Sequence, residues 1–595
     1  MKKQRTYFLF LMAAVLNLFA ATLSAQKKAT RKSATVQEGF LKVNGTKIID
    51  ATGQPVILRG MGFGGWLLQE GYMFRVHNIG QQYRIREKIT DVVGEQKAEE
   101  FYKAWLKSFI TKADIDSMAA WGFNSVRLPM HYNLFTLPVE KETVKGKQTW
   151  LKEGFTIVDS LLSWCKANHI YLILDLHAAP GGQGNDLPIS DRDSSKPALW
   201  QSEANMQKTI ELWKELAKHY VNEKWIGGYD IINEPNWGFD DVNDKRGTAE
   251  KSNKPLRQLM MDITKAIRTV DTNHIVIIEG NGFGNNYNGI FPAWDKQLAV
   301  SFHKYGNFNN RDAVKKFLAI RDEQNIPIWL GESGENSNTW FTECISLVEE
   351  NGVGWSWWPL KKMGINNPLE IKTPEGYNEL LAYWSGKGSK PTEEQAWKVL
   401  QELLQNIQLA NNKIHYDVID AMFRQVKQKT AVPFKQHIIS NKTTIAAVDF
   451  DLGRQAVAYY DKDTASYQYT PGVNTVGNKG HVYRNDGVDI KSSKEGTYIF
   501  SMEDGEWLQY TVTAEQAGTY KVVLSTSAAN AGSQLSVSVD GKIFIQQFNV
   551  PATANAEQFQ QTAAGTITLN KGLSHLKLFV DKGGCQLLTI QLIKQ

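Results

Sequence analysis

Eight short apolar segments recur along the chain, and each is followed by a polar loop and then an amphipathic stretch. The segments cover residues 56–60, 125–129, 171–177, 227–234, 274–279, 299–303, 328–332 and 354–358. Near-continuous apolar runs are typical of parallel strands covered on both faces, and their alternation with helices is typical of βα units. Eight units in one series predict a (β/α)8 TIM barrel. No Gly-x-Gly-x-x-Gly fingerprint opens any of the helices, so a dinucleotide-binding sheet lacks its main evidence.

The character of the sequence changes in its last quarter. From residue 445 onward it is rich in glycine and in short segments that alternate apolar and polar residues, such as 507–512 and 535–539. Regularly spaced short strands of this kind predict an all-β sandwich, jelly-roll-like in form. We therefore expect a barrel domain over residues 38–432, a linker over 433–444 and the β-sandwich over 445–595.

The N-terminus has the layout of a secretory signal peptide. Positive charge at Lys2, Lys3 and Arg5 precedes an apolar stretch over residues 7–21, and Leu23-Ser24-Ala25 follows. This order predicts a signal peptide over residues 1–25 with cleavage after Ala25, and then a flexible leader over 26–37. The alternative is a membrane anchor, but the apolar stretch is short for a span of ~20 residues. We expect export to the periplasm, the cell surface or the medium.

Composition excludes several other classes of protein. The three cysteines, Cys165, Cys344 and Cys585, are too few for a disulfide framework in an exported chain. The net charge of +5 is spread along the chain, so no nucleic-acid partner is expected. No later stretch is long and apolar enough to cross a membrane once the signal is removed. We expect a monomer.

Polar or aromatic side chains stand at the end of seven of the predicted strands. They are Arg127, Asp175, His177, Asn233, Glu234, Glu279, Asn281, His303, Tyr305, Glu332, Trp357 and Trp358. The carboxyl ends of the strands of a (β/α)8 barrel converge on one face, where catalytic side chains lie. These residues therefore predict a single site.

Two of the three glutamates in this set, Glu234 and Glu332, each end an apolar run abruptly. A converging pair of carboxyl groups can cleave a glycosidic bond. If a glycosyl-enzyme forms, Glu332 is the ionised nucleophile and Glu234 keeps a proton until the leaving oxygen takes it. Arg127 can orient and ionise Glu332 through a charge-assisted hydrogen bond. The alternative nucleophile is Glu335, which lies past the strand end, where a carboxylate is expected to be solvated or to contact substrate.

Sugar-binding roles follow for the neighbouring side chains. We expect Asn233 to hold a sugar hydroxyl, Tyr305 to steer the nucleophile, and His177 and His303 to line the subsite. Flat aromatic rings suit the apolar faces of sugars. The expected substrate-binding set is Arg127, His177, Asn233, His303, Tyr305, Trp358 and Trp66.

Together, several motifs resemble glycoside hydrolase family 5, the cellulase family. They are Arg127-Leu128-Pro129, Asp175-Leu176-His177, Asn233-Glu234-Pro235, Ser301-Phe302-His303-Lys304-Tyr305 and Gly331-Glu332-Ser333. The resemblance implies a retaining (β/α)8 glycosidase with Glu234 as acid/base and Glu332 as nucleophile. Residues 64–67 and 176–183 look like the exo-β-1,3-glucanase branch of that family. Ala178 stands where that branch usually has glycine, and the loop over 184–194 differs.

The predicted sandwich resembles a family 6 carbohydrate-binding module. The segments that carry this likeness are 447–453, 483–490, 505–507, 517–520 and 539–541. By that resemblance Tyr483 stacks on a sugar and Trp507 contacts one, with packing as the alternative role. Val448 stands where the family usually has a glutamate that helps to bind calcium, so a structural calcium ion stays open. No other cofactor is expected.

These observations predict a secreted retaining glycoside hydrolase that cleaves β-glucosidic bonds in a β-glucan by double displacement, with β-1,3-glucan favoured. Three alternatives remain open: an endo-hydrolase of β-1,4-glucan or mannan, a transglycosylase, and a non-catalytic glycan-binding protein. The sequence has no His-Glu-x-x-His motif and no clustered Cys/His ligands, so no catalytic metal is implied. It also lacks the Gly-x-Ser-x-Gly elbow of serine hydrolases.

Overall fold

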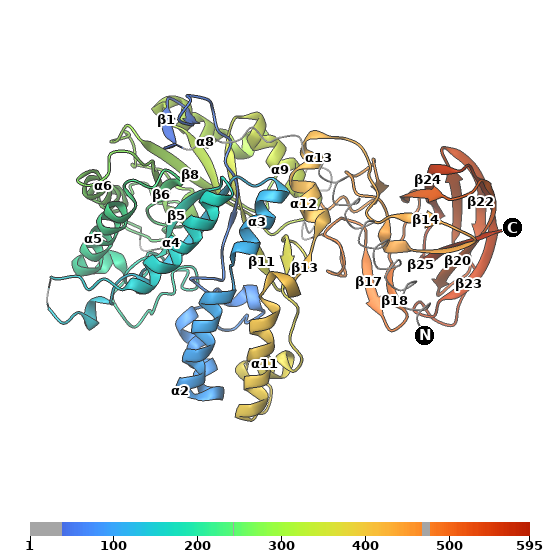
Figure 1. Ribbon diagram of the computed structural model, residues 1–595, viewed down its shortest axis with the longest axis horizontal. Helices are drawn as coiled ribbons and strands as arrows, with labels where there is room; N and C mark the ends of the chain where they lie inside the picture. The colour runs from blue at the N-terminus through green and yellow to red at the C-terminus, as the bar shows by residue number, and fades with distance from the viewer. Residues whose placement is uncertain (1–38, 145, 242, 467–476) are drawn as a thin grey trace, which may run out of the picture. The chain divides into compact units, whose positions relative to one another are not determined.

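The computed structural model describes residues 39–144, 146–241, 243–466 and 477–595 (Figure 1). The predicted signal peptide (1–25) and leader (26–37) lie outside the described residues. A short antiparallel hairpin, β1 (Lys42–Asn44) and β2 (Lys47–Ile49), comes first.

The described residues contain eight parallel strands that close into a barrel, which confirms the predicted fold. The strands are β3 (Arg59–Gly62), β4 (Ser125–His131), β5 (Tyr171–Ala178), β6 (Ile226–Asp230), β7 (Val276–Ile278), β8 (Leu298–Lys304), β9 (Ile328–Gly334) and β10 (Gly354–Trp358). The last strand pairs with the first, where Trp355 lies opposite Arg59. All residues of β5 and β9 are buried, as expected for strands with side chains packed on both faces.

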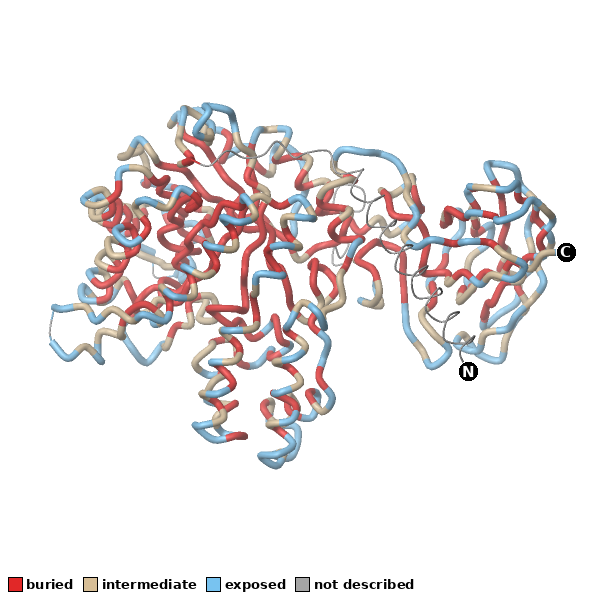
Figure 2. The backbone as a smooth tube through the Cα atoms, viewed as in Figure 1, coloured by how far each residue is buried: buried red, intermediate tan, exposed pale blue. Residues whose placement is uncertain are grey.

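Amphipathic helices surround the barrel. They are α3 (Lys112–Trp121), α4 (Lys152–Ala167), α5 (Glu203–Tyr220), α6 (Lys254–Arg268), α8 (Arg311–Gln324) and α9 (Asn338–Glu350). In α6 the buried residues Leu256, Leu259, Met260, Ile263 and Ile267 recur at helical spacing and form one apolar stripe. Figure 2 shows buried backbone concentrated in the strands, with exposed backbone on the outer turns.

Two insertions enlarge the barrel domain. The first carries α2 (Gln82–Ser108), and the second carries α10 (Tyr377–Trp384) and α11 (Glu393–Asn406). Helices α2 and α11 lie side by side (Figure 1). A small sheet of β11 (Lys361–Lys362), β12 (Leu369–Glu370) and β13 (Lys413–Ile414) follows the last barrel strand, and α12 (Tyr416–Met422) and α13 (Arg424–Lys427) end the domain.

The C-terminal domain is a sandwich of two sheets, as predicted. One sheet contains β14 (His437–Ile439), β16 (Tyr459–Tyr460), β19 (Trp507–Ala514), β21 (Gln534–Val539), β22 (Lys542–Asn549) and β24 (Gly572–Lys582). The other contains β15 (Lys442–Ala446), β17 (Ile490–Ser493), β18 (Gly496–Ile499), β20 (Gly518–Ala528), β23 (Gln560–Leu569) and β25 (Cys585–Lys594).

The segment expected as a linker, residues 433–444, differs from that expectation. Strand β14 pairs with β19, and β15 pairs with β25, so both belong to the sandwich. The reason is the apolar side chains of Ile439 and Ile445, which are fully buried in the core of the sandwich. Burial of those two side chains is more favourable than leaving the segment in water.

The three cysteines are buried and free. Within the described residues, no helix combines the length and the apolar character needed to cross a bilayer.

Candidate active site

The structure gathers the predicted polar side chains at the carboxyl end of the barrel. Arg127 comes from β4, His177 from β5, His303 from β8, Glu332 from β9 and Trp358 from β10. Asn233 and Glu234 lie three and four residues after the end of β6. All seven are buried, although they are polar or aromatic and come from different parts of the barrel. Parallel strands that all point the same way produce this convergence.

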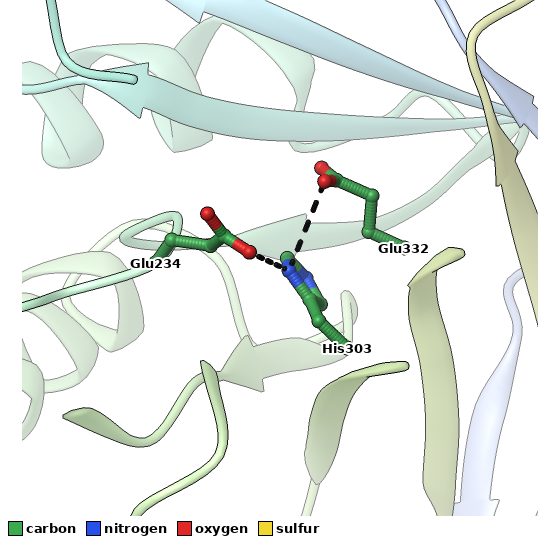
Figure 3. A group of neighbouring side chains, drawn as sticks. All are labelled: Glu234, His303 and Glu332. Carbon is green, nitrogen blue, oxygen red and sulfur yellow. Dashed lines mark hydrogen bonds and ion pairs between the residues drawn. The ribbon is translucent and has the colours of Figure 1, made fainter. Parts of the chain in front are cut away.

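The two glutamates face each other across His303 (Figure 3). A carboxylate oxygen of Glu234, a ring nitrogen of His303 and a carboxylate oxygen of Glu332 all lie within 4.8 Å of one another. Nδ1 of His303 lies 2.6 Å from Oε1 of Glu234 and 4.0 Å from Oε1 of Glu332. Retaining glycosidases hold their carboxyl groups about 5–5.5 Å apart, whereas inverting ones leave about 6.5–9.5 Å for a water molecule. The short separation fits attack by a carboxylate.

Arg127 and Tyr305 hold the predicted nucleophile from two sides. Nη1 of Arg127 donates to Oε2 of Glu332 at 2.9 Å, and the hydroxyl of Tyr305 donates to Oε1 at 2.8 Å. Both carboxylate oxygens therefore have a donor. Such charge-assisted bonds fix the rotamer of the side chain and favour its ionised form.

Arg127 also joins three other acidic residues in the barrel interior. Its Nε donates to Asp230 at 2.9 Å, its Nη2 donates to Glu279 at 3.0 Å, and its Nη1 lies 3.2 Å from Asp175. No part of the Arg127 side chain is exposed. One buried cation thus contacts four carboxyl groups and lowers the cost of burying them together.

The pKa values of these carboxyl groups are shifted in different directions. Burial and the neighbouring charge of Glu279 raise the pKa of Asp230 well above its ordinary value, and Arg127 acts in the opposite direction. Burial opposes ionisation of Glu279 as well, but the cations of His303 and Arg127 lower its pKa to about 2. Burial and the charge of Glu234 raise the pKa of Glu332, while His303 and Arg127 act in the opposite direction.

His303 is the cation between the glutamates. Burial disfavours its charged form, but the carboxylates of Glu279 and Glu332 and the hydrogen bond to Glu234 hold the pKa of His303 well above its ordinary value. Its Nδ1 therefore donates to Glu234, and its Nε2 lies 3.1 Å from Glu279. This contact fixes the orientation of the Glu234 carboxyl.

Local backbone structure directs Glu234 into the site. Its φ angle is +42°, in the left-handed region that side-chain-bearing residues rarely adopt. Oε2 of Glu279 accepts its backbone N–H at 2.7 Å. Nε2 of Gln183 donates to the backbone oxygens of Asn233 and His177, at 2.8 and 2.7 Å, and joins the two loops.

His177 and Trp358 form one wall of the site. Their rings stack with centroids 5.3 Å apart and an interplanar angle of 3°. Nε1 of Trp358 donates to the hydroxyl of Tyr72 at 2.7 Å, and Nε2 of His177 lies 3.8 Å from Oε1 of Glu70. Burial raises the pKa of Glu70 to about 8, and Glu332, Glu234 and Glu335 add to the shift. At neutral pH Glu70 is therefore a hydrogen-bond donor.

Glu335, weighed above as an alternative nucleophile, lies beyond the end of β9 and contacts Lys362. Its side chain keeps an exposed fraction of 26 %. The sequence also predicted Trp66 in the sugar site, but its indole donates to the backbone oxygen of Leu106 at 2.8 Å. Trp66 instead lines a cavity of about 590 Å³ together with Trp164. Strand β3 ends at Gly62, four residues before Trp66, so Trp66 is not held at the carboxyl end of the barrel by that strand.

The aromatic residues expected to bind sugar in the sandwich are covered by lysines. The ammonium groups of Lys413 and Lys435 lie 5.2 and 5.4 Å from the ring centroid of Tyr483. The ammonium of Lys577 lies 3.7 Å from the ring centroid of Trp507.

Glu234, His303 and Glu332 also satisfy the spacing of metal ligands, and they are the one such group found among the described residues. An imidazole must be neutral to bind a metal. Because the neighbouring carboxylates keep His303 protonated, the arrangement fits acid–base chemistry better than metal binding. The expectation that no metal takes part stays a prediction, as does the question of calcium in the sandwich.

Three residues of the site were absent from the predicted set: Glu70, Tyr72 and Gln183. Glu70 and Tyr72 lie in a long insertion without strand or helix periodicity. The one signal there is an acidic residue next to the apolar run Trp66-Leu67-Leu68. Gln183 lies inside the segment 176–183 that resembles the glucanase branch, but its structural role depends on contacts across two loops.

Comparison with known families agrees with this geometry. Residues 86–364 match the model "Cellulase (glycosyl hydrolase family 5)", and residues 481–594 match "Carbohydrate binding module (family 6)". The barrel is a glycosyl hydrolase family 5 domain. The chain is therefore a glycoside hydrolase, and the alternative of a non-catalytic protein is set aside.

Relatives of the family 5 domain come from fungi, yeast and bacteria. A "Beta-xylosidase" of Phanerodontia chrysosporium is 29 % identical over 58 % of this chain and 75 % of its own. "Endoglucanase C" of Acetivibrio thermocellus is 24 % identical over 46 % of this chain and 90 % of its own. "Glucan 1,3-beta-glucosidase" of Candida oleophila is 28 % identical over 50 % of this chain and 67 % of its own.

Proposed function

We propose that this family 5 enzyme is an exo-acting retaining β-glycosidase that removes glucose from β-1,3-glucan. The observation that carries the retaining mechanism is the short separation of Glu234 and Glu332, whose carboxylate oxygens lie within 4.8 Å. Relatives named for the β-1,3-glucosidase and β-xylosidase activities support attack at chain ends.

The proposed reaction has two steps. Glu332 attacks the anomeric carbon as the glycosidic C–O bond breaks, and the leaving oxygen takes the proton from Glu234. In the second step a water molecule gives a proton to Glu234 and attacks the same carbon, which releases Glu332 and restores the β configuration. Tyr305 and Arg127 hold the two oxygens of Glu332 for the first step.

The wall beside the site supports recognition of a terminal sugar. Trp358, His177 and Glu70 lie together, and the hydrogen bond from Trp358 to Tyr72 joins the β10 strand to the first insertion. A protonated Glu70 can donate to a sugar hydroxyl, and the ring of Trp358 can stack on an apolar sugar face.

A time course of products from linear β-1,3-glucan tests this proposal, with Glu332→Gln as the control. Release of glucose alone from the start, lost in the variant, is the expected result. A ladder of oligosaccharides would mean an endo-hydrolase. Absence of products would overturn the β-1,3 assignment and move the search to β-1,4-glucan, mannan and aryl β-xyloside. Transfer products at high acceptor concentration would identify a transglycosylase.

We also propose that the enzyme is exported after cleavage at Ala25. The support is the charged and apolar pattern of residues 1–25. N-terminal sequencing of the mature protein should begin at Gln26. A mature protein that retains residues 1–25 would favour the membrane anchor instead.

A further inference from the structure

The loop that follows the nucleophile connects the barrel to the C-terminal module. Strand β9 ends at Gly334 and helix α9 begins at Asn338, so residues 335–337 form the connection. Glu335 has a φ angle of +55° and directs its carboxylate to Lys362 at the edge of the site. The ammonium of Lys362 lies 5.8 Å from the ring centroid of Tyr72, whose hydroxyl accepts the indole N–H of Trp358, so this loop lies beside the substrate wall.

Asn485 of the module holds this loop through its side chain and its backbone. Its Nδ2 donates to the backbone oxygen of Asn336 at 2.8 Å and to Oδ1 of Asn338 at 3.2 Å. Its backbone oxygen accepts the N–H of Asn338 at 3.0 Å. Asn485 is fully buried, so water cannot replace these bonds if they are lost.

Neighbouring residues extend the same contact. Oδ2 of Asp417, on α12, accepts the backbone N–H of Asn485 and the Nδ2 of Asn338, both at 2.8 Å. The hydroxyl of Ser337 donates to the backbone oxygen of Ala465 at 2.6 Å, and it also caps α9 by accepting the N–H of Trp340. The loop after the nucleophile is thus held from both ends by buried polar groups.

The rings expected to bind sugar in the module do not explain why the module is present. Lysine ammonium groups lie over both Tyr483 and Trp507. The contact through Asn485, in contrast, is built from buried groups that hydrogen-bond to one another through its Nδ2 and its backbone. The contacts of the module with the loop after Glu332 are therefore better defined in the structure than a glycan-binding surface at Tyr483 and Trp507.

We propose that Asn485 is a positioning residue of the active site, and that the module acts through it to hold Glu335 and Lys362 at the substrate wall. The proposal rests on the function proposed above only for its kinetic readout.

A tethered glycan-binding module changes the turnover of polymeric substrates. A positioning module also changes the turnover of a small soluble substrate, because the loop itself moves.

The test uses the full-length chain with Asn485→Ala and, as a matched control, Asn549→Ala. Asn549 is an exposed residue at the end of β22 in the same module. The substrate is an aryl β-glucoside or an aryl β-xyloside. It is chosen as the one that the wild type cleaves and the Glu332→Gln variant does not. Displacement of active-site groups by ~1 Å can cost up to about 100-fold in rate. We expect Asn485→Ala to lower kcat/KM by about tenfold, chiefly through KM, and Asn549→Ala to match the wild type.

A double-mutant cycle with Glu335→Gln separates positioning from general loss of stability. If Asn485 acts through Glu335, the two substitutions together lower kcat/KM by less than the product of their separate effects. Independent effects that multiply, or an unchanged kcat/KM in a folded Asn485→Ala variant, would overturn the proposal.

A second measurement does not depend on any substrate. Asn485→Ser keeps the backbone oxygen that accepts the N–H of Asn338 but removes the side-chain bonds to Asn336 and Asn338, which hold the loop. Hydrogen exchange over residues 334–340 should therefore become faster in Asn485→Ser and stay unchanged in Asn549→Ala. Unchanged exchange in Asn485→Ser would contradict the proposed positioning. If the wild type cleaves no aryl glycoside, the proposed function has failed, and hydrogen exchange still decides the role of Asn485.

Discussion

The guanidinium of Arg127 donates from Nη1 to Oε2 of Glu332 across 2.9 Å, deep in a barrel interior from which the arginine has no exposed surface. The same guanidinium contacts Asp175, Asp230 and Glu279. Arg127 therefore both orients the nucleophile and stabilises the buried carboxyl groups of the barrel. A change at Arg127 affects both, whereas a change at Glu332 removes only the nucleophile.

Replacing Arg127 by methionine should destabilise the fold strongly. The variant keeps the apolar stem but leaves buried carboxyl groups without their cation, and breaking a buried ion pair in this way costs about 3–5 kcal/mol. Chemical denaturation measures the free energy of unfolding. Arg86→Met is the control, because Arg86 and Glu99 form a pair with exposed fractions of 41 and 47 %. That control should lose less than about 1 kcal/mol. Equal losses in both variants would contradict the role of Arg127.

Replacing Glu234 by glutamine should make turnover depend on the leaving group. General acid catalysis contributes about 10²–10⁴-fold, so cleavage of the natural glycosidic bond should fall by that amount. Formation of the glycosyl-enzyme from a dinitrophenyl glycoside should fall far less, because that leaving group needs no proton. A burst of dinitrophenol followed by slow turnover is the expected trace. Glu332→Gln should show no burst, and a burst in that variant would mean that Glu332 is not the nucleophile.

Glu70 should set an alkaline limit on activity. Its pKa is raised to about 8, so it donates a hydrogen bond below that pH and adds a negative charge beside Glu332 above it. We expect kcat/KM of the wild type to fall as the pH rises through 8. Glu70→Gln cannot ionise, so that part of the alkaline limb should disappear. An unchanged pH profile in the variant would assign the limb to another group.

The same shift has a consequence for stability. The folded protein keeps the Glu70 proton up to about pH 8, whereas the unfolded chain loses it near the ordinary value of 4.5. The stabilisation from Glu70 is therefore complete below about pH 4.5 and is lost as the pH rises through 8, at about 1.4 kcal/mol per pKa unit. Denaturation of wild type and Glu70→Gln over this pH range tests this expectation. The free energy of unfolding of the wild type should fall relative to that of Glu70→Gln as the pH rises, because the variant cannot ionise at this position.

Removing divalent cations should leave turnover unchanged. His303 lies between Glu234 and Glu332, and the surrounding carboxylates keep its pKa high, so protons compete with any metal for its nitrogens. Prolonged dialysis against EDTA, followed by assay on the same glycoside, tests this expectation. Loss of activity that returns with one added metal would show that the cluster of Glu234, His303 and Glu332 binds an ion.

The apolar runs predicted the barrel well because burial on both faces leaves a strong signal in each strand. The last strand was predicted at residues 354–358, and β10 has those bounds. The fourth was expected to continue to Glu234, but β6 ends at Asp230. The backbone still donates from Ile231 to Ile277 and from Asn233 to Leu176, and Glu234 then adopts a left-handed conformation that a strand cannot contain.

Residues outside the strands were harder to predict. Glu70 and Tyr72 reach the site from an insertion whose path depends on tertiary packing, and no periodic pattern marks them. Asn485 lies about 150 residues from the loop that it holds, so its contact has no local signal in the sequence. For Trp66 the sequence predicted a sugar contact that the structure does not place at the site. The motif over residues 64–67 resembles the glucanase branch, but the indole of Trp66 is buried and donates to the backbone oxygen of Leu106.

Trp358 and Trp66 should respond differently to the same substitution. Trp358 stacks on His177 beside the catalytic pair, so Trp358→Leu should raise KM by roughly tenfold, which corresponds to about 1.4 kcal/mol of binding. Trp66 fills a separate part of the barrel domain and donates to Leu106, so Trp66→Leu should cost about 2 kcal/mol of stability and leave KM unchanged. Steady-state kinetics and denaturation of both variants measure the contrast. A rise in KM in Trp66→Leu with unchanged stability would return Trp66 to the substrate site.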